Sequence, residues 1–183
     1  MLRFMDFLFA LLGLVLSAPV LLIIYLAILF ESGAPIFKQK RVGIKEKPFI
    51  LYKFRTMNIG TPSIASHFSD PASITRLGVF MRRIKLDELP QLWNVLKGDM
   101  SFIGPRPCLP NQTELIQLRN NHGLFDVRPG ITGLAQIRGI DMSVPNLLVD
   151  VEYEMMSDLT LRKYFHYIIM TLLGRGYGDR IKV

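Results

Sequence analysis

The first thirty residues of the chain place the strongest constraint on its structure. Between Phe7 and Phe30 no side chain carries a charge, and roughly 20 apolar residues are enough to cross a bilayer as a helix. A cleaved signal peptide has a shorter apolar core, of about 7–15 residues. The run is also long for the buried core helix of a small domain. We therefore interpret it as a helix inserted into a membrane.

Pro19 lies in the middle of this run, where a proline removes a helical hydrogen bond and clashes with the preceding turn. One outcome is a kinked helix that spans the membrane, and the other is a helix–break–helix hairpin that enters one leaflet and returns. Basic residues flank the run, with Arg3 before it and five after it: Lys38, Lys40, Arg41, Lys45 and Lys47. The positive-inside rule places the downstream side in the cytoplasm. A span sends the N-terminus outside, a hairpin keeps both ends inside, and the residue pattern allows both.

Length and charge narrow the function classes. The 183 residues leave room for one domain of roughly 150 residues after the apolar run. A net charge of +7 and a pI near 9.7 suit an anionic membrane surface, a phosphorylated substrate or nucleic acid. Against nucleic acid, the sequence has no zinc-ligand spacing, basic zipper or RNP-like aromatic motif. The single cysteine, Cys108, cannot form an internal disulfide, which fits a reducing compartment and a packing role.

Two adjacent carboxylates, Asp87 and Glu88, lie at the start of a predicted short helix. Because proline is tolerated only in a first helical turn, Pro90 places the start of this helix close to Asp87, and Gly98 is its predicted end. Unpaired N–H groups and the helix dipole favour ionised carboxylates at such a position and also attract phosphate. The simpler interpretation is an acidic helix cap with a neighbouring salt bridge. The surrounding cations instead favour a nucleophile or a metal ligand in phosphoryl chemistry.

Two segments before this pair carry basic side chains that are candidates for phosphate contacts. A strand at residues 49–57 carries Lys53 and Arg55 on one face. These two side chains are either phosphate contacts or a solvent-facing surface. A short helix at residues 75–84 is predicted to bring Arg82 next to the acidic pair.

Other segments carry weaker signals. Residues 58–73, rich in Ser, Pro and Gly, predict a loop beside the site. Asn111 and Glu114 form a capping-box pattern at the start of one helix, and Ser143 and Thr160 are predicted to cap two later helices. The last helix combines basic and aromatic residues with an apolar stripe, which is typical of a helix in the headgroup plane or of ordinary core packing.

Several motifs together resemble a known family. They are the apolar start with its central proline, Tyr52–Met57, Leu86–Ser101, Gly104–Pro107 and Val127–Gln136. Any one of these pieces could arise by chance, whereas the whole set in this order is highly specific. On these motifs the chain resembles the small monotopic phosphoglycosyl transferases, which are bacterial sugar transferases that act on a polyprenyl phosphate.

The resemblance implies transfer of a sugar 1-phosphate from a UDP-sugar to undecaprenyl phosphate or another polyprenyl phosphate, with release of UMP. This reaction begins the assembly of a surface glycan. Asp87 would attack the β-phosphorus to form a covalent phosphosugar intermediate, and Asp87 and Glu88 would hold Mg²⁺. The residues expected to contact phosphate or nucleotide are Lys53, Arg82, Arg106, Arg128 and Gln136.

The resemblance also implies an α/β fold that is mainly helical with a few short strands. Residues 1–33 would form a re-entrant membrane hairpin broken near Pro19, and residues 34–183 a catalytic domain with interfacial helices. The domain would lie on the cytoplasmic face of the bacterial inner membrane, with a UDP-sugar, polyprenyl phosphate and membrane lipids as partners, no nucleic acid, and a homodimer left open. Two other classes remain as alternatives: a catalytically silent membrane-attached scaffold and a membrane-anchored nucleic-acid-binding protein.

Overall fold

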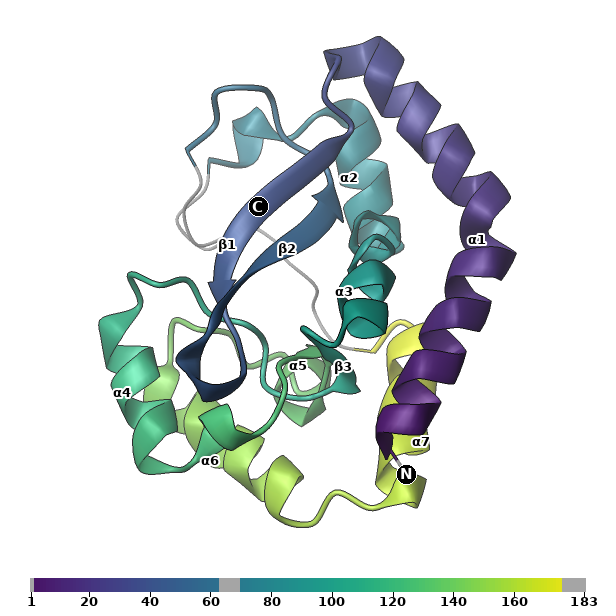
Figure 1. Cartoon of the computed structure of the whole chain (residues 1–183). Helices are drawn as coiled ribbons and strands as arrows, with labels where there is room; N and C mark the ends of the chain where they lie inside the picture. Colours follow the sequence, from purple (N-terminus) through teal and green to yellow (C-terminus); the bar gives the residue numbers. More distant parts are fainter. Residues whose placement is uncertain (1, 63–69, 176–183) are drawn as a thin grey trace.

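The N-terminal helix α1 (Leu2–Ser32) continues through Pro19 in the computed structural model, which describes residues 2–62 and 70–175. The predicted break is replaced by a bend in the middle of α1 (Figure 1). Proline removes one hydrogen bond, and the rest of the helical ladder can persist around a kink. Part of the predicted loop 58–73 lies outside the described residues.

After α1 the chain forms short strands and helices. The strands are β1 (Ile36–Val42), β2 (Pro48–Phe54), β3 (Ser101–Ile103) and β4 (Gly130–Thr132). The helices are α2 (Arg76–Arg83), α3 (Gln91–Lys97), α4 (Thr113–Asn121), α5 (Leu134–Ile137), α6 (Pro145–Ser157) and α7 (Leu161–Leu172). Single 3₁₀ turns are η1 (Ile44–Glu46), η3 (Pro71–Ser73), η4 (Leu86–Glu88) and η5 (Leu124–Asp126). This mixture confirms the prediction of a mainly helical fold with a few short strands.

The strands form two small sheets. β1 and β2 pair as an antiparallel hairpin, and β3 and β4 pair in parallel. Gly104 and Gly130 stand where the second pair comes closest, since a Cβ on Gly130 would lie 2.1 Å from the backbone nitrogen of Gly104. Only a residue without a side chain permits that approach. It places the loop after β3 directly against the start of β4.

Of the three predicted helix caps, one is confirmed and two are wrong. Thr160 caps α7 as predicted, and Thr75 Oγ1, for which no cap is predicted, accepts the N–H of Gly78 at the start of α2. The predicted Asn111 capping box is wrong, because the N-cap of α4 is the next residue and has no side-chain cap bond. Ser143 does not cap α6 either, since its hydroxyl bonds to Asp141.

Both ends of α1 are attached to the domain. Near the start, Asp6 is 3% exposed, and its Oδ1 accepts bonds from Ser101 Oγ at 3.0 Å, from a backbone N–H of β3 at 3.1 Å and from Tyr164 Oη at 2.9 Å. Burial and the Asp6 carboxylate raise the pKa of Tyr164. Near the end, Ile24 and Ile28 are buried against β2 and α2. The helix therefore lies along the domain, with α7 beside its N-terminal half (Figure 1).

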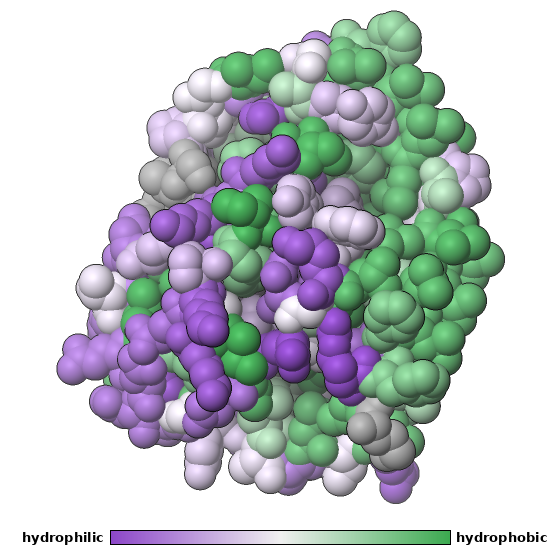
Figure 2. All heavy atoms as spheres, in the orientation of Figure 1, coloured by the Kyte–Doolittle hydropathy of each residue, from purple (hydrophilic) through white to green (hydrophobic). Residues whose placement is uncertain are grey.

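The outer face of α1 is apolar and uncovered. α1 is the one helix in the described ranges that is long and apolar enough to cross a membrane, and only 11% of its most apolar window is buried. Figure 2 shows hydrophobic side chains gathered along this edge and hydrophilic ones gathered over the opposite side. A core helix would be mostly covered. The exposed face of α1 thus supports association with a membrane, as the sequence predicts.

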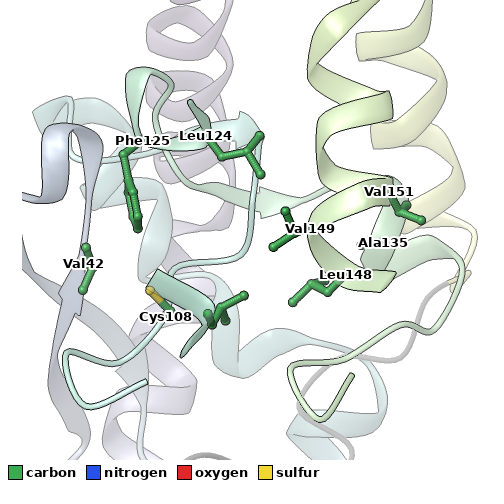
Figure 3. Close-up of a cluster of buried hydrophobic side chains, with 9 residues drawn as sticks. Val42, Cys108, Leu124, Phe125, Ala135, Leu148, Val149 and Val151 are labelled. Atoms are coloured by element: carbon green, nitrogen blue, oxygen red, sulfur yellow. The ribbon is translucent and has the colours of Figure 1, made fainter. Parts of the chain in front are cut away.

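The main apolar core lies at the end of the molecule away from α1. Side chains from the end of β1, from η5 and from α6 meet around Cys108 (Figure 3). The labelled members are Val42, Cys108, Leu124, Phe125, Ala135, Leu148, Val149 and Val151. Cys108 has no exposed surface, which confirms its predicted packing role, and burial raises the pKa of its thiol.

Candidate active site

The acidic pair lies on the 3₁₀ turn η4, directly before α3. Lys85 precedes the turn in a left-handed backbone conformation, with φ of 60°, and Pro90 stands at the N-cap of α3. Gly98 ends α3 with φ of 95°, as the sequence predicts. The single predicted helix is therefore a 3₁₀ turn followed by a short α-helix, and helical backbone begins at Leu86, next to Asp87.

Asp87 is buried, with 5% of its surface exposed. The turn that carries it packs against β2 and α2. Leu86, the preceding residue, joins the apolar cluster that contains Phe54 and Met81. This packing fixes the backbone of the acidic pair, so its carboxylates are held ready for a bound group instead of being ordered by it.

Glu88 is held by two cations from distant parts of the chain. Its Oε1 accepts a hydrogen bond from Lys53 Nζ at 3.2 Å and another from Arg106 Nη2 at 3.0 Å. The side chains are 11% exposed for Glu88, 9% for Lys53 and 21% for Arg106. Hydrogen bonds between charged groups are roughly twice as strong as neutral ones. Three predicted site residues thus meet at one point beside Asp87, in an arrangement that suits a phosphate-bearing ligand.

The two cations predicted to project together from the strand at 49–57 are separated. Lys53 is buried and reaches the acidic pair, so the solvent-facing interpretation is wrong for it. Arg55 instead donates from Nε to the carbonyl of Ala34 at 2.8 Å and lies over the ring of Phe37. β2 ends one residue before Arg55, so the strand alternation no longer sets its direction.

The remaining predicted residues have different surroundings. Arg82, on α2, donates from Nε to Thr56 Oγ1 at 2.9 Å, which fixes it just beyond β2. Arg128 donates to the carbonyl of Gly98 at 2.8 Å, a bond that joins the segment before β4 to the end of α3. Gln136 is buried in α5, and neither polar atom of its side chain has a hydrogen-bond partner among the residues that the structure describes. An unpartnered buried amide costs about 1–3 kcal/mol. A bound ligand that supplied the missing hydrogen bonds would remove this cost, and the contact between Gln136 and a nucleotide stays a prediction.

A second buried ion pair, which sequence analysis missed, supports Arg106. Arg119 Nη2 on α4 lies 2.7 Å from Glu152 Oε1 on α6, and the two side chains are 2% and 0% exposed. Glu152 Oε1 also accepts the backbone N–H of Arg106 at 3.3 Å. The sequence gives no clear signal for this pair, because Glu152 is one of three acidic residues in α6, with Asp150 and Glu154, and nothing in the pattern marks which of them is buried.

Asp87 and Glu88 are also the candidate ligands for Mg²⁺. Within residues 2–62 and 70–175, no group of three or more His, Cys, Asp or Glu side chains could hold a metal ion. Mg²⁺ is usually bound through one or two carboxylates, with waters and substrate phosphates completing its shell. The adjacent carboxylates fit that pattern, in which a bound diphosphate supplies further ligands.

Two largely apolar pockets lie between α1 and the domain. The first, the α1–α7 pocket, has a volume of about 430 Å³. Its apolar wall includes Phe9, Gly13, Leu92, Phe102, Phe165 and Ile168. Lys85 and Glu88 also line it. The second, the α1–β1 pocket, has a volume of about 820 Å³ and is lined by side chains that include Leu22, Lys38 and Trp93. Of these two pockets, the first is the one with a carboxylate of the acidic pair in its wall.

Comparison with known proteins finds relatives whose sequences are similar over much of this chain. A Bacillus subtilis protein provisionally named undecaprenyl-phosphate N-acetylgalactosaminyl 1-phosphate transferase is 48% identical over 119 residues, which are 63% of this chain and 66% of that protein. The UDP-glucose:undecaprenyl-phosphate glucose-1-phosphate transferases of Caulobacter vibrioides and Escherichia coli K12 are 37% and 42% identical. Those matches cover 82% and 73% of this chain, and 61% and 30% of the relatives. The chain thus spans from about a third to two thirds of these proteins.

The sequence pattern described as bacterial sugar transferase matches residues 1–174. That stretch includes all of α1, the acidic pair on η4 and the loop that carries Arg106. The residues that meet at Glu88 therefore lie inside the matched region, together with the apolar helix. The chain belongs to the bacterial sugar transferase family.

Proposed function

We propose that this protein transfers a sugar 1-phosphate from a UDP-sugar to undecaprenyl phosphate and releases UMP. The observation that carries the proposal is the meeting of Lys53 and Arg106 on Glu88, next to a buried Asp87. Phosphoryl transfer depends chiefly on positioning and charge neutralisation, and this cluster supplies both. The names of the relatives support the same reaction class.

The proposed route has two steps. A carboxylate oxygen of Asp87 bonds to the β-phosphorus of the UDP-sugar, the bond from that phosphorus to the bridging oxygen breaks, and UMP leaves with the electron pair. A phosphate oxygen of the lipid then attacks the same phosphorus and releases the Asp87 carboxylate. Two simpler steps replace one that would need both substrates in the site together.

The cations act on the charge that this route develops. Lys53 and Arg106 lie where they can offset the negative charge of the transferred phosphate, and Arg82 is the next candidate. Mg²⁺, when bound by Asp87 or Glu88, would neutralise the diphosphate of the donor. Each of these assignments is part of the proposal.

The proposal includes a re-entrant arrangement of α1 on the cytoplasmic face of the inner membrane. Arg3 and Asp6 are bonded to the domain near one end of the helix, and Ile28 is packed on it near the other. A straight span would carry Arg3 and Asp6 across the bilayer, away from the groups that bind them. A bent helix that enters one leaflet keeps both ends beside the domain.

The topology can be tested with a Phe4→Cys variant, because Phe4 is 65% exposed while the natural Cys108 is fully buried. A membrane-impermeant maleimide should label this variant in inverted inner-membrane vesicles and leave it unlabelled in intact spheroplasts. The opposite pattern would establish a span with the N-terminus outside.

The reaction can be tested by UMP release from purified protein in nanodiscs. A panel of UDP-sugars with Mg²⁺ and undecaprenyl phosphate should give release with at least one donor, and Asp87→Asn should abolish it. Equal release by the two proteins would place the nucleophile elsewhere. A folded protein that is silent with every donor would favour the scaffold alternative.

A further inference from the structure

The α1–α7 pocket joins an apolar interior to the acidic pair. Its wall is built from α1, α3 and α7 with residues of β3 and β4, and Glu88 and Lys85 also line it. Its volume of about 430 Å³ falls in the range of ligand pockets, roughly 300–1,000 Å³. A ligand that fills it must have an apolar body and can carry a charged group at the acidic pair.

The polar groups in the wall favour an apolar occupant. The hydroxyls of Thr132 and Thr171 bond to each other at 2.7 Å, and Thr171 also donates to the carbonyl of Tyr167. Their hydrogen bonding is therefore met inside the protein. Gly13 lets α1 lie close to Leu92 in this wall, since a Cβ there would lie 3.1 Å from a methyl group of Leu92. An apolar chain can lie along this wall without leaving a hydroxyl unpaired.

The charges near Glu88 favour an anionic head on that chain. Lys53 and Arg106 bind Glu88, and Lys85 lines the same pocket. The pocket also lies beside α1, whose outer face exposes large hydrophobic side chains. A lipid with an anionic head could therefore leave the membrane beside α1 and reach the acidic pair.

We propose that the α1–α7 pocket holds the first isoprene units of the polyprenyl phosphate acceptor, with its phosphate at the Glu88 end. This assignment rests on the function proposed above and places the acceptor chain on the α7 side of α1. The larger α1–β1 pocket is the competing location. It has Lys38 in its wall and lacks a carboxylate of the acidic pair.

A photoreactive probe tests the location without requiring turnover. The probe is a polyprenyl phosphate with a diazirine near its phosphate end, added to Asp87→Asn protein in nanodiscs. Labelling is expected on α7 or α3 residues of the α1–α7 pocket, and excess undecaprenyl phosphate should suppress it. Labelling confined to β1 and Trp93 would assign the chain to the α1–β1 pocket. Equal suppression by phosphatidylglycerol would make this a general lipid pocket.

Kinetics give a second, independent test. Ile168→Trp narrows the α1–α7 pocket, Ile169→Trp adds the same bulk on an exposed neighbouring side chain, and Leu22→Trp narrows the α1–β1 pocket. Ile168→Trp should raise the KM for undecaprenyl phosphate at least fivefold, with less than a twofold change in the two controls. A raised KM in Leu22→Trp alone would overturn the proposal.

The experiments distinguish an error in the pocket assignment from an error in the proposed function. UMP formed from the donor alone, without acceptor, reports folding and the first step. Ile168→Trp should retain at least half of that burst, so its defect appears only with the lipid. No burst from wild-type protein with any donor would reject the proposed function, and the labelling pattern would still decide the pocket. A burst and turnover with no label on α7 or on Leu92 would reject the pocket alone.

Discussion

Two glutamates in this protein have similar partners but different surroundings. Glu88 accepts bonds from Lys53 and Arg106 at the wall of a pocket. Glu152 accepts bonds from Arg119 and from the backbone N–H of Arg106, and it is fully buried between α4 and α6. One cluster is reachable by a ligand, while the other is enclosed by protein.

This difference in accessibility gives the two clusters different roles, although both consist of a glutamate bound by basic groups. In the enclosed cluster the partners are fixed, so the bonds hold α4, α6 and the loop after β3 together. In the accessible cluster the cations bind a carboxylate and can also bind a phosphate that arrives beside it. Arg106 belongs to both, since its backbone is bound by Glu152 and its guanidinium by Glu88. The enclosed pair therefore positions a residue of the accessible one.

The largest effect is expected when the enclosed pair is broken. Glu152→Gln leaves the charge of Arg119 buried without its carboxylate, which should lower the free energy of unfolding by about 3–5 kcal/mol. Denaturant unfolding in detergent would measure the loss. Replacing both partners, as Arg119→Met with Glu152→Leu, should restore most of the stability but leave the N–H of Arg106 without its acceptor. Recovery of full activity in that double variant would show that the pair does not position Arg106.

The same substitution in the accessible cluster should act mainly on the reaction. Glu88→Gln is expected to lower UMP release by about 100-fold or more, because a group that organises charge around the phosphate is lost. Its loss of unfolding free energy should be less than half that of Glu152→Gln, since Lys53 and Arg106 lie near a solvent-reachable pocket. Steady-state kinetics and the same unfolding assay provide the comparison. A Glu88→Gln protein with normal turnover would contradict the proposed site.

Cys108 provides a chemical test of enclosure, because it lies in the sealed core beside Arg119. The thiolate is the reactive form, and burial raises the pKa of this thiol. Iodoacetamide should therefore label the folded protein slowly even at pH 8.5, and label the chain rapidly in guanidinium chloride. At every pH between 7 and 8.5 the unfolded chain should be labelled much faster than the folded protein, because the raised pKa leaves less thiolate in the folded state. Similar rates in both states would contradict an enclosed core.

The smallest effect is expected for an ion pair on the surface. Arg138 and Glu154 form two bonds, at 2.9 and 3.1 Å, but their side chains are 45% and 56% exposed. Water competes for both charges, so Arg138→Gln should change the free energy of unfolding by less than about 1 kcal/mol. A loss as large as that of Glu152→Gln would mean that burial does not explain the difference between the clusters.

Local features of this protein could be predicted from the sequence because their causes are local. The uncharged run predicts the apolar helix, and the end of α3 at Gly98 and the cap at Thr160 follow from residues within a few positions. The convergence of Lys53, Glu88 and Arg106 was predicted only through the resemblance to a family. Local patterns failed where neighbouring residues can each begin a helix. The predicted cap of α4 was Asn111, and the helix is instead capped one residue later.

By itself, then, the sequence determined the long apolar helix, the acidic pair before α3 and the family. The tertiary structure decided which charges are buried together. Tyr164 and Asp6 are 158 positions apart, and Arg119 and Glu152 are 33 apart, so no local pattern links them. The tertiary structure also placed Lys53 at the site and Arg55 away from it. A charged residue looks the same in a sequence whether water or a buried partner surrounds it, and only the packing of distant segments makes that choice.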